Sequence, residues 1–251
     1  MKKRIDLLLV EKKNISSRNK AQAMIMAGQV YVENKKVLKS GEIFDSDIEI
    51  SINNLHPEWV SRGSIKLIHA IRKFDLNFEN YTCLDLGAST GGFTEVLLNQ
   101  KAKKIYAVDV GKNQLHEKLR KEKKIINLEK TNARYLNEEI IKEEIQLIVC
   151  DVSFISLKKV IFPCIKFLSE TNGKIIALIK PQFEAKKNEI KKGGIIKDTK
   201  VHNRVCDEIK DWFINECNMN VKGLIESPIK GFKGNKEFLI LAEINYKNLI
   251  Q

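Results

Sequence analysis

Hydrophobic positions in the first fifty residues follow two different periods. Residues 4–13 place apolar side chains among charged ones, and a second helical pattern starts at Ser16 or Ser17 and stops at Gly28. The strand-like apolar runs that follow lie at residues 30–32, 37–38 and 48–52. This pattern predicts a compact α+β module in which a pair of helices precedes short strands.

From residue 64 onward the pattern changes. A helical spacing covers residues 64–74, and apolar runs of strand length then alternate with helical stretches. The predicted strands are residues 82–86, 104–109, 125–128, 147–151, 175–179, 221–225 and 237–244. Alternation of this kind is typical of a mostly parallel sheet with helices on both faces. The sequence therefore predicts a Rossmann-like α/β domain after the small module.

Pro57 interrupts the pattern between these two parts, because proline restricts the residue before it to extended geometry. We expect residues 1–54 to form the small domain, residues 55–63 a linker, and residues 64–251 the α/β domain. Within the α/β domain, residues 186–200 are rich in lysine and lack apolar periodicity, so they predict a loop.

The charge of the chain points to a polyanionic partner. Its 251 residues include 44 Lys and Arg against 32 Asp and Glu, which leaves a formal net charge of +12. Such a charge favours salt-sensitive binding to nucleic acid, although a general bias toward lysine would produce the same excess. The apolar runs are too short to cross a bilayer, and the start of the chain lacks the apolar stretch of an export signal. We therefore expect a cytoplasmic protein with no stable membrane association.

Five cysteines lie inside apolar segments and include no Cys-x-x-Cys pair. This arrangement favours buried thiols in a reducing compartment over disulfides or a zinc site. We expect no metal site. No long heptad pattern is present, so a monomer is expected.

A buried strand runs into a glycine-rich turn and then a helix at residues 83–94. In a doubly wound sheet this turn lies where ligands bind, and the next strand ends in Asp109, whose carboxylate would grip a ribose diol. The turn reads G-x-x-x-G-G, with Ser89 where the dinucleotide fingerprint G-x-G-x-x-G has its middle glycine. We favour S-adenosylmethionine as cofactor, with a dinucleotide or a merely structural turn as alternatives. The candidate cofactor-binding residues are Asp85, Gly87, Ser89, Thr90, Gly91, Gly92, Phe93, Asp109 and Asp151.

Further polar residues stand at the ends of other predicted strands. Asp151 and Lys180 end two strands, and Glu237 opens the last one. Lys66 lies on the helix that leads into the sheet. We expect these four side chains to meet at the ligand edge of the sheet. Each one alone has an ordinary alternative as a solvated or strand-end residue, so the hypothesis depends on the combination.

The chemistry that this set suits is transfer to a hydroxyl group. A ribose hydroxyl is a poor nucleophile and needs a base or a cationic field. A lysine desolvated beside another cation can lose its proton and act as a base, and we assign that role to Lys180. Lys66 would supply the field, while Asp151 and Glu237 would orient the amine and the hydroxyl. A methyl group on a sulfonium is already activated, so we expect the transfer to need no metal.

The order of these motifs along the chain resembles the TlyA or hemolysin-A family of ribosomal RNA 2′-O-methyltransferases. The resemblance covers almost the whole chain and rests on residues 4–6, 17–22, 27–30, 59–63, 85–94, 109–111, 151–156, 178–184, 192–194, 227–231 and 234–238. It implies an S4-type RNA-binding module, an FtsJ-like class I methyltransferase domain, and a catalytic set at Lys66, Asp151, Lys180 and Glu237. It also implies S-adenosylmethionine as methyl donor, a cytidine ribose in ribosomal RNA as acceptor, and ribosomal subunits as partners.

Basic residues of both domains are candidates for RNA contacts. Contacts to phosphates would position the substrate without reading its sequence, and the competing interpretation is a solvated lysine surface. A ribose in a folded helix is not freely accessible, so local opening or base flipping is expected. The candidates are Arg4, Arg18, Lys20 and Lys36 in the small domain and Arg62, Lys186, Lys187, Lys191, Lys192, Lys230 and Lys233 in the α/β domain.

Three other functions fit parts of the pattern. A noncatalytic RNA-binding ribosome-assembly factor would use the α/β domain only as a scaffold and predicts a broken catalytic set. A membrane-active hemolysin would need an export signal and an amphipathic insertion segment. A dehydrogenase would need a glycine where Ser89 stands.

Overall fold

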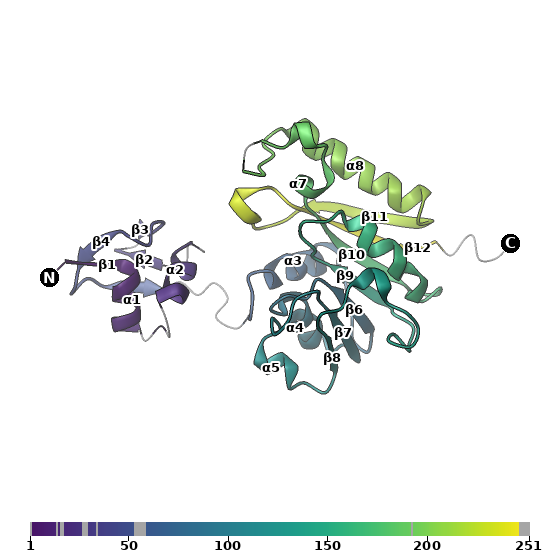
Figure 1. The fold of residues 1–251 in the computed structure, drawn as a ribbon, viewed down its shortest axis with the longest axis horizontal. Helices are drawn as coiled ribbons and strands as arrows, with labels where there is room; N and C mark the ends of the chain where they lie inside the picture. The colour runs from purple at the N-terminus through teal and green to yellow at the C-terminus, as the bar shows by residue number, and fades with distance from the viewer. Residues whose placement is uncertain are drawn as a thin grey trace. The chain divides into compact units, whose positions relative to one another are not determined.

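The computed structural model describes residues 2–13, 15, 18–26, 30–33, 35–52, 59–191 and 193–245. The chain forms two compact units, Met1–Glu58 and Trp59–Gln251 (Figure 1). The second unit begins five residues before the expected start at residue 64, because Trp59 and Val60 pack against its core. Several positions used in the sequence predictions lie outside the described residues, namely Ser16, Ser17, Gly28, Pro57 and Lys192.

The smaller unit contains both predicted helices, α1 (Ile5–Lys13) and α2 (Arg18–Met26). Its strands are β1 (Lys2–Arg4), β2 (Val30–Val32), β3 (Lys35–Lys36), β4 (Ile43–Asp45) and β5 (Ile50–Ile52). β2 pairs antiparallel with β3 and β5, and β1 pairs antiparallel with β4. The apolar faces of both helices and of β2 form one core that includes Ile5, Leu9, Ile25 and Val30. β1 and β4 have no prediction, because three residues are too few to show a period.

The second predicted strand of this unit is displaced. The strand falls at Lys35–Lys36 instead of residues 37–38, because the hairpin register places Tyr31 opposite Lys36. Val37 continues the pairing through a 2.9 Å hydrogen bond from its N–H to Val30 O, and its side chain is buried.

In the part of the chain that the structure describes, the larger unit has one sheet of seven strands, in the order β11-β12-β10-β9-β6-β7-β8. Their bounds are β6 Thr82–Leu86, β7 Lys104–Val108, β8 Ile125–Leu128, β9 Leu147–Cys150, β10 Lys174–Ile179, β11 Met219–Glu226 and β12 Phe238–Ile244. Only β12 among them runs against its neighbours, while the pairs from β8 to β10 are parallel. The predicted mostly parallel α/β fold is confirmed, and every predicted strand is present within a few residues.

Helices cover both faces of this sheet (Figure 1). α3 (Ser64–Phe74) and α4 (Gly92–Asn99) share one core with the side chains of Cys83, Ile105 and Val149. The opposite face is covered by α6 (Leu157–Ile161), the 3₁₀ helix η2 (Phe162–Phe167) and α8 (Thr199–Asn215). These helices pack on strand residues such as Leu84 and Ile148, which are adjacent in sequence to Cys83 and Val149. Successive strand residues point to opposite faces, which is why these strands read as continuous apolar runs.

The remaining helices are short. They are α5 (Glu117–Arg120), α7 (Pro181–Glu184) and the 3₁₀ turns η1 (Ala133–Tyr135), η3 (Lys187–Glu189) and η4 (Phe232–Gly234). The predicted loop at residues 186–200 contains η3, and α8 starts at Thr199, where Asp198 Oδ1 caps it by accepting from Lys200 N at 2.9 Å.

Four of the five cysteines are buried and Cys217 is half-buried. Burial raises the pKa of the Cys164 and Cys206 thiols to about 12, which keeps these thiols protonated. Across the described residues, no helix has both the length and the apolar composition needed to cross a membrane.

Candidate active site

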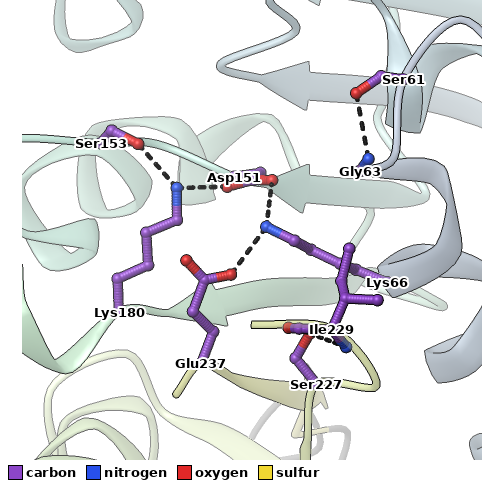
Figure 2. A network of polar contacts seen from close by, with 9 residues as sticks. All are labelled: Ser61, Gly63, Lys66, Asp151, Ser153, Lys180, Ser227, Ile229 and Glu237. Carbon is purple, nitrogen blue, oxygen red and sulfur yellow. Dashed lines mark hydrogen bonds and ion pairs between the residues drawn. The ribbon is translucent and has the colours of Figure 1, made fainter. Parts of the chain in front are cut away.

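Four charged side chains meet at the edge of the sheet where the parallel strands end (Figure 2). Asp151 follows β9, Lys180 follows β10, and Glu237 precedes β12. Because β12 is antiparallel to β10, its first residue lies at the edge where β10 ends. A parallel last strand would have placed Glu237 at the opposite edge. The reversed strand therefore completes the cluster.

Lys66 joins this cluster from α3. It lies on the buried side of that helix together with Leu67 and Ala70, and helical spacing brings it over the sheet edge. Its Nζ lies 2.8 Å from Glu237 Oε2 and 3.3 Å from Asp151 Oδ2. Lys180 Nζ lies 2.6 Å from Asp151 Oδ1 and donates to Ser153 Oγ at 2.8 Å. The two lysines thus approach the two oxygens of one carboxylate (Figure 2).

These four side chains are largely removed from solvent, with exposed side-chain fractions of 10% for Lys66, 19% for Asp151, 9% for Lys180 and 3% for Glu237. Burial alone would lower the pKa of Lys66, but the charges of Asp151 and Glu237 outweigh it and raise this pKa above its usual value. Burial alone would raise the pKa of Asp151, but Lys66 and Lys180 outweigh it, so this pKa lies below its usual value. Lys66 is therefore held as a cation and Asp151 as an anion.

A cavity of about 650 Å³ opens above this cluster, which we call the catalytic cavity. A second cavity of about 590 Å³ surrounds Asp109, and we call it the cofactor cavity. The two cavities share wall residues on the glycine turn and on the segment after β9. The shared residues are Gly87, Ser89, Asp151, Ser153 and Phe154. Two ligands could therefore meet over these residues.

Asp109 follows β7 and is fixed by the backbone around it. Its Oδ2 accepts from Ser89 N at 2.8 Å and its Oδ1 accepts from Gly111 N at 2.7 Å. Each carboxylate oxygen has a second lone pair, so Asp109 can still accept from a ligand diol. The cofactor cavity continues over apolar side chains of Val108, Val110 and Ile155. A carboxylate beside an apolar wall suits the ribose and base of a nucleoside.

The glycine turn allows close approach to these cavities. Gly87 has φ +84°, and a Cβ there would lie 2.9 Å from Asp151 O. Gly91 has φ +97°, a conformation that glycine adopts without strain. Ser89 adopts φ 49° without being glycine, and its N–H is the donor to Asp109. Thr90, Gly92 and Phe93 line the catalytic cavity, whereas Gly91 lines neither cavity.

Asp85 lies behind the turn. It is fully buried, lines neither cavity, and accepts from Thr94 Oγ1 at 2.5 Å through its Oδ2. Burial raises the pKa of Asp85 to about 7. Asp85 was a predicted cofactor ligand, but its side chain binds Thr94 of α4 and does not face either cavity.

Sequence reasoning missed several residues of the two cavities. Ser153 and Phe154 follow Asp151, and Gln182 and Phe183 follow Lys180. Gln182 Oε1 is buried with no hydrogen-bond partner among the described residues, so a ligand donor would stabilise it. The cofactor cavity adds Gln114, Thr131, Asn132, Ala133 and Arg134. The position of Thr131–Arg134 just after a predicted strand was the available signal for that group.

The predicted RNA-binding residues of the larger unit lie around the catalytic cavity or on nearby loops. Arg62 and Lys230 are exposed and line the cavity itself. Lys186, Lys187 and Lys191 are exposed beyond α7. Lys233 Nζ donates to Gly193 O at 3.0 Å, which ties the lysine-rich loop to the turn before Glu237.

In the smaller unit, Asp6 organises the predicted arginines. Its buried carboxylate accepts from Arg4 Nε and Nη2 at 3.1 and 2.9 Å and from Arg18 Nε at 3.0 Å. Arg4 lowers the pKa of Asp6 well below its usual range against the opposing effect of burial. Lys36 is exposed, with its Nζ 5.7 Å from the centre of the Tyr31 ring. Lys20 lies on α2, and its side chain is outside the described residues.

The sheet defines the class of protein. From β8 to β10 its order matches the doubly wound order of nucleotide-binding domains, but the antiparallel β12 between β10 and β11 departs from the all-parallel dinucleotide order. The larger unit is thus a doubly wound domain with a ligand edge that carries an acidic and basic cluster. Residues 59–244 match the family model of FtsJ-like methyltransferases, and residues 3–47 match that of the S4 domain. The chain belongs to the FtsJ-like methyltransferase family and carries an N-terminal S4 domain.

Named relatives agree with this assignment. Hemolysin A of Brachyspira hyodysenteriae is 44% identical over 89% of this chain and 92% of its own length. The 16S/23S rRNA (cytidine-2′-O)-methyltransferase TlyA of Mycobacterium tuberculosis is 36% identical over 94% of this chain and 88% of its own length. A solved structure from Streptococcus thermophilus, provisionally described as a hemolysin, has a TM-score of 0.76, 38% identity, and covers 96% of this chain and 88% of that one. The resemblance expected from the sequence motifs is confirmed.

Proposed function

We propose that this protein transfers a methyl group from S-adenosylmethionine to the 2′-hydroxyl of a cytidine ribose in ribosomal RNA. The observation that carries the proposal is the contact network of Lys66, Asp151, Lys180 and Glu237 beside two joined cavities. The mycobacterial relative is named as an rRNA (cytidine-2′-O)-methyltransferase, which supports a cytidine ribose of ribosomal RNA as the acceptor. The noncatalytic alternative predicts a broken cluster, which these contacts do not support.

The cofactor cavity fits S-adenosylmethionine in its donor set. Asp109 would hold the ribose diol, and the apolar wall at Val110 and Ile155 would contact the adenine. Gly87 leaves room beside Asp151 O, where a Cβ would be too close. Asp85 would contribute from beneath, by fixing Thr94 on α4. When bound, S-adenosylmethionine supplies a sulfonium-activated methyl group.

The residues of the cluster divide the work on the acceptor. Lys180 would accept the proton of the 2′-hydroxyl, and Asp151 and Ser153 hold its amine in place. Lys66 would remain a cation and stabilise negative charge that develops on the ribose oxygen. Glu237 orients Lys66, and Gly231 leaves the space that its carboxylate occupies.

The RNA would reach this site through phosphate contacts and base stacking. Arg62 and Lys230 stand at the catalytic cavity, and the S4 domain presents Arg4, Arg18 and Lys36. Phe154 is 85% exposed at the rim of both cavities, so its ring offers a face to a flipped-out base. Since ribosomal RNA is the acceptor, we place the protein in the cytoplasm. A monomer stays a prediction.

Mass-spectrometric mapping of ribose methylation tests this function. Ribosomal RNA from cells that lack the gene should lose at least one 2′-O-methylcytidine, and the intact gene should restore it. A gene that carries Lys180→Ala is the matched control and should not restore it. Identical methylation with and without the gene, together with no transfer by the purified protein to ribosomal subunits, would refute the proposal.

A further inference from the structure

The segment between β9 and α6 has an unusual position in this site. It starts at Asp151, and its residues Ser153 and Phe154 form walls of both cavities. Phe154 has φ 65°, in the left-handed region that a bulky side chain rarely adopts. A strained backbone of this kind persists only when the surroundings hold it in place. Contacts at both ends of the segment hold it in this structure.

One end of the segment is held by the catalytic cluster itself, through the Lys180 contacts to Asp151 and Ser153. The other end is held by Glu184, on the last turn of α7. Glu184 Oε2 accepts from Ser156 Oγ at 2.6 Å, and its Oε1 accepts from Leu157 N at 2.7 Å. Between these two attachments, the Phe183 ring packs on Phe154, with centroids 5.1 Å apart.

Glu184 is half-buried, so its carboxylate depends more on these two hydrogen bonds than an exposed carboxylate would. Burial raises the pKa of its carboxyl, while the hydrogen bonds from Ser156 and Leu157 act in the opposite direction. Each of its two carboxylate oxygens accepts one hydrogen bond from the segment. α7 is attached to the segment at both of its ends. Lys180, just before its first residue, contacts one end of the segment, and Glu184, its last residue, contacts the other.

We propose that Glu184 is a positioning residue for methyl transfer, which acts by fixing the segment from Asp151 to Leu157 against α7. Without it, the strained backbone at Phe154 has one attachment fewer, and Ser153 and Phe154 can leave the walls of both cavities. Misplacement of about 1 Å in a reacting assembly can lower a rate ~100-fold. This inference rests on the proposed methyl transfer.

The test compares Glu184→Ala and Glu184→Gln in the full-length protein, with tritiated S-adenosylmethionine and purified ribosomal subunits. Glu184→Ala should slow single-turnover transfer at saturating substrates by ~10- to 100-fold. Glu184→Gln should recover to within ~3-fold of wild type, because its amide oxygen can accept from Leu157 N–H and its amide nitrogen can donate to Ser156 Oγ. Rescue by the amide separates hydrogen bonding from charge.

Glu143→Ala is the control for a merely structural role. Glu143 also accepts from two side chains, Lys104 Nζ and Tyr106 Oη, but near the start of β7, at the edge of the sheet away from the site. The Glu143→Ala variant should change the unfolding temperature and leave the transfer rate at saturating substrates within ~2-fold of wild type. Glu184→Ala should instead lower that rate at a temperature where circular dichroism shows it fully folded.

The inference is overturned if folded Glu184→Ala transfers methyl within ~2-fold of wild type, or if Glu184→Gln is as slow as Glu184→Ala. If Glu184→Ala does not fold, Ser156→Ala removes one of the two bonds and should still slow transfer ~3- to 10-fold; an unchanged rate then overturns the inference. Absence of transfer by the wild-type protein would refute the proposed function instead, so the two failures are distinguishable.

Discussion

Lys66 Nζ lies 2.8 Å from Glu237 Oε2. This contact joins α3, which precedes the sheet in the chain, to the start of β12, the last strand in the chain. Glu237 and Asp151 together raise the pKa of Lys66, so this lysine stays protonated. A protonated lysine cannot accept the proton of a hydroxyl group. In the proposed mechanism, Lys66 therefore supplies a fixed positive charge, and the role of base belongs to Lys180.

The first prediction concerns the cofactor. Asp109→Ala should weaken S-adenosylmethionine binding by ~10-fold or more, because it removes a carboxylate acceptor and leaves the N–H groups of Ser89 and Gly111 without their partner. Isothermal titration calorimetry measures this directly.

Asp85→Asn is the companion variant. It keeps the size of the side chain and an oxygen that can accept from Thr94, so a role beneath the turn predicts a smaller loss of cofactor affinity than for Asp109→Ala. If neither variant changes the dissociation constant, the glycine turn and Asp109 are not the cofactor site.

The second prediction concerns the division of labour between the two units. Each unit has its own hydrophobic core, so a shortened chain that begins at Trp59 should fold. It should bind S-adenosylmethionine with unchanged affinity and lose most of its affinity for ribosomal RNA, because Arg4, Arg18 and Lys36 are absent. Calorimetry and filter binding at two salt concentrations measure the two affinities.

Full-length Arg4→Ala/Arg18→Ala is the control that keeps the S4 core. It should weaken RNA binding and flatten its dependence on salt, since fewer phosphate contacts release fewer counterions. Methylation of ribosomal subunits by the shortened chain at the full rate would show that the S4 domain is not needed for RNA affinity.

Much of the larger unit could be predicted from the sequence because buried parallel strands leave a strong signal. The apolar runs at β6 and β8 match the strands residue for residue. The proposed catalytic set could be predicted from Asp151, Lys180 and Glu237 at strand ends and from Lys66 on the preceding helix, which needs no side-chain detail. The direction of β12 could not be read from its apolar run, although it decides on which edge Glu237 lies.

Other features depend on tertiary contacts that no local pattern records. Glu184 was visible only as part of a motif, and its bonds to Ser156 and Leu157 form across two elements. Asp6 was likewise visible only as part of the S4-type resemblance, yet it holds Arg4 and Arg18. Asp85 stands at a strand end like Asp151, but its side chain points to α4 and not to a cavity.

The last prediction separates a base from a charge anchor at Lys180. Lys180→Arg keeps the positive charge and can still pair with Asp151, but guanidinium stays protonated in proteins. If Lys180 accepts the hydroxyl proton, this variant should bind cofactor and RNA nearly normally and transfer methyl at least ~100-fold more slowly. A general base at this position also predicts a single-turnover rate that rises with pH in the wild type and does not in the variant.

Lys66→Arg is the built-in control for that experiment. In the proposed mechanism Lys66 provides only a positive charge between Asp151 and Glu237, so arginine should be tolerated better there than at position 180. Single-turnover methylation by both variants across a pH series decides between the roles. A near-normal rate and an unchanged pH profile for Lys180→Arg would make Lys180 an electrostatic anchor, and the hydroxyl proton would then leave by a route that does not use this amine.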